Sequence, residues 1–129
     1  QQFFWLADLS LIKIITKEKQ PIGFLFAYPD VSDVVKKING KLFPFGWIQV
    51  LKGLKTSTVV DINGMGMIKE YRGSGGTAIL FDELVKSDQP RFTRVEIVQI
   101  GEKNVQMLRE LLNFQIKWHK THRLYSRLL

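Results

Sequence analysis

The five residues Arg72-Gly73-Ser74-Gly75-Gly76 form the stretch of this 129-residue chain best suited to chemistry. Glycines allow positive φ angles and lack Cβ atoms, so successive N–H groups can converge on one point. Apolar residues then recur at helical spacing to about Ser87, at Leu80, Phe81, Leu84 and Val85. The free N–H groups and the dipole of a helix starting at Thr77 would add to the same positive field. The sequence therefore predicts an anion site, and a phosphate is its natural occupant.

Three familiar phosphate or nucleophile motifs do not match this region. The dinucleotide fingerprint requires a third glycine after Gly64-Met65-Gly66, and Lys69 occupies that position. A Walker loop requires Gly-Lys followed by Ser or Thr, and the chain contains no such triplet. A nucleophile elbow requires glycine two residues before Ser74, where Arg72 stands instead. A plain strand-to-helix turn remains the alternative.

The elements around the glycine-rich stretch have to position it. Residues 59–68 read as a strand, in which Gly64 and Gly66 mark a bulge or a close approach of a ligand. Strands are also predicted at 11–16, 21–28, 93–100, 114–119 and 123–129, with short helices at 33–37 and 47–54 and a longer one opened by Asn104. The strand at 93–100 should pair in parallel with 59–67, because a helix joins them. The continuous apolar character of 21–28 predicts a strand covered on both faces.

An aromatic-rich insert separates the second and third strands. It contains Phe43, Phe45 and Trp47, and we expect its helix at 47–54 to lie over the sheet. Two interpretations are open: the insert lines a substrate pocket, or it caps the core, which base rates of aromatic burial favour. Residues 1–10 are apolar with little periodicity and predict a short helix or a docking segment.

The run from Gly66 to Gly73, followed by Ser74-Gly75-Gly76-Thr77, resembles the acyl-CoA signature of the GNAT (GCN5-related) N-acetyltransferases. The signature is Arg/Gln-x-x-Gly-x-Gly/Ala, matched by Arg72 and Gly75, with Thr77 in the last position. The resemblance covers residues 11–129 in layout and 59–113 in motif. It implies a mixed α/β (α+β) GNAT fold: a mostly antiparallel sheet with one splayed parallel strand pair, flanked by helices. We expect residues 1–129 to form one domain whose N-terminal part is abbreviated or missing, and the initial Gln1 to reflect processing or truncation.

The resemblance also implies a cofactor site for acetyl-CoA. The CoA pyrophosphate would contact the amides of residues 72–77, which are Arg72, Gly73, Ser74, Gly75, Gly76 and Thr77. The pantetheine arm would pair with the backbone of Met65 to Met67, and the thioester carbonyl would accept an N–H near Met67. Asn104 matches an asparagine that contacts pantetheine or the acceptor, and an ordinary helix cap is an equal alternative.

The reaction that the resemblance implies is direct attack of a primary amine on the thioester, which requires a proton acceptor and a proton donor. Asp61 and Glu96 lie on the paired strands and could begin a water-linked proton path, although each is more often a solvated carboxylate. Tyr125 is the candidate acid for the departing thiolate, against the alternative of a core tyrosine. His119 and His122 lack the cysteines of a usual zinc site, so we expect no metal.

Composition limits the remaining options. A hydrophobic content of 45% and a charged content of 24% are typical of a soluble globular protein, and no apolar run is long enough to span a bilayer. The absence of cysteine favours a reducing cytoplasm. A net charge of +7 favours anionic partners, which are CoA, nucleic acid or a membrane surface, and does not by itself choose among them. We expect CoA and a small-molecule or peptide amine as partners, with a homodimer possible and no membrane. A non-catalytic CoA-binding module and a basic nucleic-acid-binding domain are the alternatives, the latter unlikely.

Overall fold

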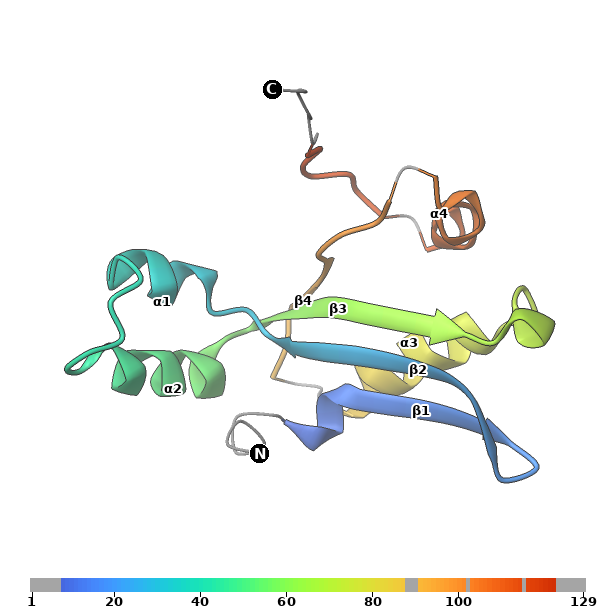
Figure 1. The fold of residues 1–129 in the computed structure, drawn as a ribbon, viewed down its shortest axis with the longest axis horizontal. Coiled ribbons are helices and arrows are strands. Elements are labelled where there is room, and N and C mark those ends of the chain that lie inside the picture. The colour runs from blue at the N-terminus through green and yellow to red at the C-terminus, as the bar shows by residue number, and fades with distance from the viewer. Residues whose placement is uncertain (1–7, 88–90, 102, 115, 123–129) are drawn as a thin grey trace, which may run out of the picture. The chain divides into compact units, whose positions relative to one another are not determined.

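The computed structural model describes residues 8–87, 91–101, 103–114 and 116–122 (Figure 1). Residues 1–99 and 100–129 form two compact units, which are described separately. The elements of the first unit are a 3-10 turn at Leu9–Leu11, β1 (Ile12–Lys17), β2 (Gln20–Pro29), α1 (Ser32–Lys37), α2 (Gly46–Thr56), β3 (Val59–Met67), a 3-10 turn at Lys69–Tyr71, α3 (Gly76–Ser87) and β4 (Arg94–Ile97). The second unit contains α4 (Val105–Leu112).

The sheet of the first unit has the strand order β1-β2-β3-β4. β1 pairs with β2 and β2 with β3 in antiparallel fashion, whereas β3 and β4 are parallel. The parallel pairing extends only from Val59–Arg94 to Ile62–Ile97, with one further bond from Val98 N–H to Ile62 O at 3.1 Å. β3 itself continues to Met67. The two parallel strands therefore separate beyond Ile62, as the resemblance implied.

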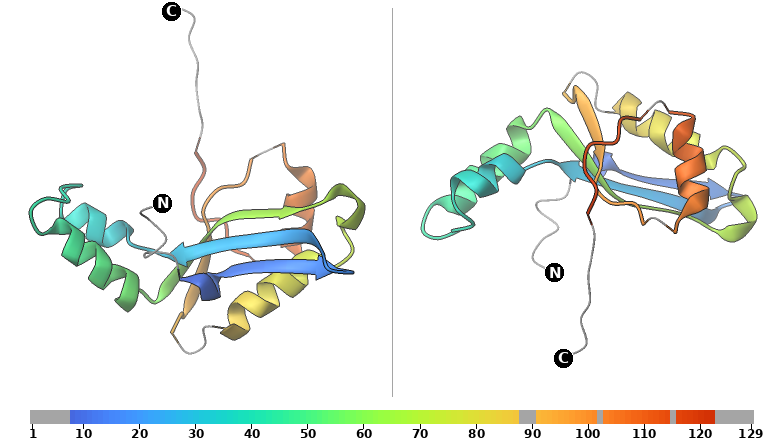
Figure 2. Two further views of the ribbon diagram at one scale, coloured as in Figure 1. Left: turned by 60° about the horizontal axis from the view of Figure 1, so that its bottom comes forward. Right: turned by 90° about the horizontal axis from the view of Figure 1, so that it is seen from above.

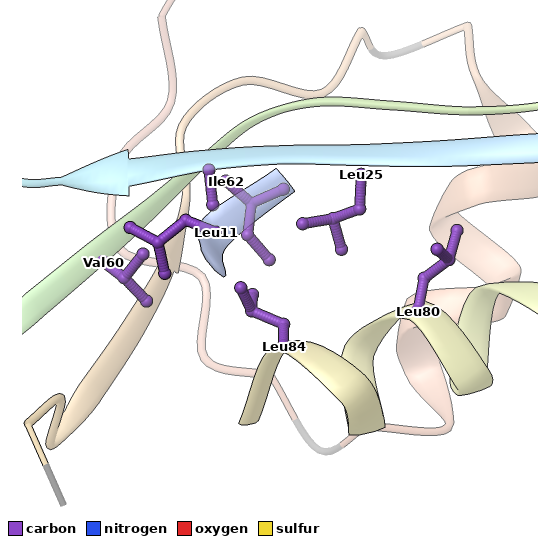
Figure 3. Close-up of a cluster of buried hydrophobic side chains, with 7 residues drawn as sticks. Leu11, Leu25, Val60, Ile62, Leu80 and Leu84 are labelled. Carbon is purple, nitrogen blue, oxygen red and sulfur yellow. The ribbon is translucent and has the colours of Figure 1, made fainter. Parts of the chain in front are cut away.

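Helix α3 runs along one face of this sheet (Figure 2). Apolar side chains of α3 and of the strands fill the space between them (Figure 3). The cluster consists of Leu11, Leu25, Ala27, Val60, Ile62, Leu80 and Leu84, each at most 3% exposed. Leu80 and Leu84 are four residues apart, as one face of a helix requires. The core thus fixes α3, and with it the glycine-rich turn that precedes it.

A β-bulge interrupts β3 at Asn63. Phe26 of β2 lies opposite Gly64 while Ala27 lies opposite Ile62, so Asn63 is the extra residue. The prediction of a bulge near Gly64 is therefore confirmed. After the bulge, Met65 and Met67 point toward the core. Gly66 faces the other way and lies under Phe24, whose ring carbon would be 2.8 Å from a Cβ there.

The opposite face of β2 is less covered than the sequence predicted. Leu25 and Ala27 are buried, but Phe24 is 50% exposed and Phe26 is 39% exposed. The expectation that both faces of this strand are covered was wrong, because only alternate side chains reach the α3 core.

The insert between β2 and β3 forms a helical hairpin of α1 and α2, beyond the end of the sheet from which β2 leaves and β3 returns (Figures 1 and 2). The helices meet at Gly53, where a Cβ would lie 2.7 Å from Val34 Cγ2. The prediction that α2 lies over the sheet was wrong, and so was the interpretation of its aromatic residues as a cap on the core. Phe43, Phe45 and Trp47 are 87%, 68% and 48% exposed.

The second unit differs from the sequence prediction after α4. Phe114 lies in a turn, and the described residues 116–122 form neither helix nor strand, so the strand expected at 114–119 is not formed there. Alternation of apolar and polar residues describes a strand only when a neighbouring strand pairs with it. The strand expected at 123–129 lies outside the described residues, as do residues 1–7.

Candidate functional site

The glycine-rich turn between β3 and α3 adopts the backbone that its sequence predicts. Gly73 and Gly75 have φ angles of +75° and +86°, which favour glycine. A Cβ at either position would have no heavy atom within 4 Å, so the turn is open at both glycines. The conformation needs glycine for its backbone angles, and the space beside it is free for a bound group.

The hydrogen bonds of the turn show which of its amides are engaged. The N–H groups of Arg72 and Ser74 donate to Lys69 O and Tyr71 O at 3.3 Å each, and Ser74 Oγ donates to Tyr71 O at 2.6 Å. The first N–H groups of α3, from Gly76 onward, have no acceptor within the helix, as at every helix N-terminus. The positive end of the α3 dipole lies at the same place. An anion at this turn would therefore face unsatisfied amides.

Met67 connects the turn to the end of β3. A Cβ on Gly76 would lie 2.6 Å from Met67 Cε, and one on Gly23 of β2 would lie 2.7 Å from Met67 Sδ. The thioether thus occupies the space that these two glycines leave. This contact holds the first residue of α3 directly against the sheet.

The backbone of β3 has a free edge next to this turn. Ile68 N–H donates to Ile22 O on the β2 side at 2.9 Å, and alternate residues of a strand face the same neighbour, so Met65 and Met67 direct their backbone groups to the other edge. Beyond Ile62, no described strand pairs with that edge. Arg72 Nε donates to Met67 O at 3.0 Å, which places the guanidinium beside this edge of β3. The edge can accept one more extended chain.

A carboxyl with a raised pKa lies further back along β3. Asp61 is 9% exposed, and burial raises its pKa to about 6, helped by the charges of Asp30 and Glu96 and opposed by Arg94. Glu96 is the β4 partner of Asp61 in register and forms an ion pair with Arg94 at 2.9 Å. The two carboxylates named from the sequence are therefore neighbours, and Asp61 is the one suited to exchange a proton near neutral pH.

Two other residues that the sequence suggested, Asn104 and Tyr125, lie outside the strand and the turn. Asn104 is the N-cap of α4, and its side chain accepts the N–H of Met107 at 3.2 Å, which is the cap interpretation. Tyr125 lies outside the described residues. Within the part of the chain that the structure describes, no group of three or more His, Cys, Asp or Glu residues could hold a metal ion.

Sequence reasoning missed two side chains at this site. Lys17, at the end of β1, places its Nζ 4.9 Å from the centre of the Tyr71 ring and so adds a cation beside the turn. The packing role of Met67 was also missed. The signal for Met67 was the pair of small residues Gly23 and Gly76, which are distant in sequence and informative only once the strands are paired.

Comparison with known sequences gives two relatives. No family model matches the chain. Protein YghO of Escherichia coli is 29% identical over 133 residues, covering 98% of this chain and 34% of its own length. A bacterial ceramide synthase of Caulobacter vibrioides is 26% identical over 136 residues, covering 100% of this chain and 33% of its own length. The chain therefore spans about a third of the length of these relatives.

Solved structures identify the fold. The aminoglycoside N-acetyltransferase AAC(6')-Iy in complex with CoA superposes with a TM-score of 0.58 at 13% identity, over 92% of this chain and 75% of that protein. The aminoglycoside 6'-N-acetyltransferase AAC(6')-IG of Acinetobacter haemolyticus gives 0.52 at 18% identity, over 90% and 68%.

Within the described residues, none of the helices is long and apolar enough to cross a membrane.

The mixed sheet, the parallel pair that separates beyond Ile62 and the glycine-rich turn before α3 agree with the resemblance found in the sequence. The chain has the mixed α+β fold of the GNAT N-acetyltransferases.

Proposed function

We propose that this protein transfers an acyl group from acyl-CoA to a primary amine. The observation that carries the proposal is the continuity of two features: the free backbone edge of β3 leads directly into the amides at the start of α3. An extended arm ending in a pyrophosphate matches that combination, because the arm can pair with the strand and the phosphates can bind the amides. CoA has both parts.

The contacts of the turn suggest which residues bind each part. The pyrophosphate would take the amides of Gly73, Gly75, Gly76 and Thr77, since those of Arg72 and Ser74 already donate within the turn. The Arg72 guanidinium, fixed by Met67 O, would add charge beside the phosphates. The pantetheine amides would pair with the backbone of Met65 and Met67.

The chemistry needs few protein groups. The neutral amine attacks the thioester carbonyl, a C–N bond forms and the C–S bond breaks, so CoA leaves as a thiolate that needs a proton. A backbone N–H of the free edge, near Met67, would stabilise the oxyanion. Asp61 lies six residues before Met67, about 20 Å along an extended strand, so it would remove the ammonium proton through water. Tyr125 is proposed to protonate the thiolate. The charge of Glu96 is proposed to add to the effect of burial and of Asp30 in raising the pKa of Asp61.

The names of the similar proteins suggest two classes of amine as the acceptor. The structural neighbours are named for acetylation of aminoglycosides. The Caulobacter relative is named for ceramide synthesis, and a ceramide is the fatty amide of a long-chain amino alcohol. Both reactions join an acyl group to a primary amine. Aminoglycosides and long-chain amino alcohols are therefore the first two acceptor classes to compare.

Calorimetric titration of acetyl-CoA into the wild type and Gly75→Asp tests the site. Aspartate tolerates a positive φ, so the variant should fold, while its carboxylate would repel the pyrophosphate. We expect the affinity to fall at least roughly tenfold, from electrostatic repulsion in the turn. The matched control is Gly40→Asp, with a φ of +71° and nothing within 4 Å of its Cβ, in the α1–α2 hairpin. Equal affinities for all three proteins would refute the site.

A release assay separates an enzyme from a binding module. Free CoA is measured with each acceptor class present, for acetyl-CoA and a long-chain acyl-CoA. Binding that is sensitive to Gly75→Asp, without CoA release for any acceptor, would favour the non-catalytic module.

A further inference from the structure

The α1–α2 hairpin carries an exposed apolar surface that the proposed acyl transfer does not use. Its most exposed members are Phe43, at 87%, and Phe45, at 68%. We call the set the hairpin surface; it consists of Val35, Leu42, Phe43, Phe45, Trp47, Ile48 and Leu51, each between 37% and 87% exposed. Exposed apolar residues gathered in one segment of 17 residues mark an interaction site.

This surface is held in place by the hairpin itself. A Cβ at Gly46 would lie 2.0 Å from Lys41 O, so the two ends of the loop touch. Lys41 N–H donates to Ile38 O at 2.9 Å and Trp47 N–H to Leu42 O at 3.0 Å. The indole N–H of Trp47 donates to Pro44 O at 3.0 Å, which satisfies its one polar group within the loop. The apolar side chains are thus presented to solvent by a hydrogen-bonded loop.

The contact between the helices leaves these residues outside. α1 and α2 meet through Val34 and Gly53, with Val31 also nearby. Val31, Val34 and Gly53 are not members of the hairpin surface, whose seven residues stay at least 37% exposed.

The segment that carries the hairpin surface is positively charged. Residues 31–58 contain five lysines and one aspartate, a net charge of +4. The lysines Lys36, Lys37, Lys41, Lys52 and Lys55 are all exposed. The aspartate, Asp33, lies 3.9 Å from Lys36 in an exposed ion pair, which neutralises at most one of them. Exposed apolar side chains and exposed cations in one hairpin complement a partner that is apolar inside and anionic at its boundary.

We propose that the hairpin surface binds the surface of a lipid bilayer that contains anionic lipids. Phe43, Phe45 and Trp47 would enter the boundary between headgroups and acyl chains, where aromatic residues are favoured. The lysines would contact the anionic headgroups, whose negative surface potential attracts basic segments. The proposal concerns peripheral binding and does not depend on the acyl-transfer activity. The sequence led us to expect no membrane partner, and binding of the hairpin surface to a bilayer departs from that expectation.

Sedimentation with vesicles tests this proposal on the full chain. The vesicles are phosphatidylcholine alone or phosphatidylcholine with about 30% phosphatidylglycerol, whose anionic headgroups give the surface a negative potential. We expect binding to the anionic vesicles, at least fivefold weaker binding to the neutral ones, and release by 0.5 M NaCl. Phe43→Ser/Phe45→Ser should lose at least tenfold in affinity. Both side chains are exposed, so circular dichroism should show the fold retained.

A charge-matched pair of variants tests the lysines. Lys37→Glu/Lys41→Glu should abolish binding to anionic vesicles. Lys13→Glu/Lys19→Glu makes the same change in net charge in β1 and in the β1–β2 turn, outside the hairpin, and should bind almost as the wild type does. Equal loss in both variants would mean that net charge alone attracts the protein, and would overturn the proposal.

Two other results would also overturn it. Failure of the wild type to sediment with anionic vesicles would exclude lipid as the occupant. A concentration-dependent dimer that Phe43→Ser/Phe45→Ser dissociates would assign the hairpin surface to a second copy of the chain. In either case the calorimetric test with Gly75→Asp still decides the CoA site, so the two proposals fail separately.

Discussion

At the scale of single residues, the Asp61 carboxyl has the environment that departs most from water. It is buried beside a second acidic strand residue, Glu96, and the charge of Arg94 opposes the resulting rise in its pKa. The sequence could place Asp61 and Glu96 on neighbouring strands. It could not predict a pKa near 6, because that depends on burial and on Asp30, which approaches from the end of β2.

The raised pKa of Asp61 predicts a pH-dependent stability. The carboxyl ionises near 3.8 when unfolded and near 6 when folded, so the folded state holds more protons between these values. The free energy of unfolding should therefore fall as pH rises from about 4 to 6, by up to about 3 kcal/mol, and stay lower above. Asp61→Asn should remove this loss and be the more stable protein at pH 8. Urea unfolding at pH 4.5, 6 and 8 measures it.

The control for this prediction is an exposed carboxylate of the same type. Asp33 has a side chain that is 85% exposed, and Asp33→Asn should keep the wild-type pH dependence. If Asp61→Asn keeps it as well, the effect belongs to other groups and Asp61 is unsuited to the proposed proton path.

At the scale of elements, the strand–turn–helix unit was the most predictable part of the chain. Its conformation depends on signals that lie close together in the sequence. These are the glycines at positive φ, the apolar residues that repeat every 3.6 residues in the helix, and the end of the strand where the turn begins. β4 was predicted at 93–100 but spans only Arg94–Ile97, and the strand at 114–119 was wrong in the described residues. Both errors concern strands, whose extent is set by a partner that the local pattern does not contain.

The contact of Met67 with α3 predicts a coupling between two substitutions. Gly76→Ala in the wild type should cost about 1 kcal/mol, because the new methyl meets Met67 Cε and displaces a thioether that also packs on Gly23. In a Met67→Ala background the same change should be neutral or stabilising, since alanine is the better helix residue. Four urea unfolding curves give the cycle, with an expected coupling of about 1 kcal/mol. Additive effects would mean that α3 is not held by this contact.

At the scale of the whole molecule, the net charge of +7 follows directly from the composition, but it does not indicate which anionic partner binds. Part of it lies at the glycine-rich turn, with Lys17, Lys69 and Arg72, and part lies on the α1–α2 hairpin. The positions of these groups were beyond sequence reasoning, because the hairpin was expected to cover the sheet. Exposure of its aromatic residues became evident only from the packing of α1 on α2.

The charge at the turn predicts salt-dependent binding of CoA. Raising NaCl from 50 to 500 mM should weaken the affinity roughly three- to tenfold, because the Debye length shortens from more than 10 Å to a few ångströms. Calorimetry measures the affinity, and thermal unfolding at both concentrations checks that the protein itself is unchanged. If the affinity changed by less than a factor of two, the loop amides would bind CoA without help from the surrounding cations.

The bulge at Asn63 has a consequence for the whole site. Ile62 and Ile68 are six residues apart and would face the same neighbour in a regular strand, yet Ile62 O bonds toward β4 and Ile68 N–H toward β2. The bulge therefore sets the phase of the last third of β3. If Asn63 took a regular place in the pairing instead, Gly64 and Gly66 would face the core and the free edge, and Met67 would point away from Gly76. The bulge thus decides which side chains of β3 meet α3, so the spacing of these residues is constrained as well as their chemistry.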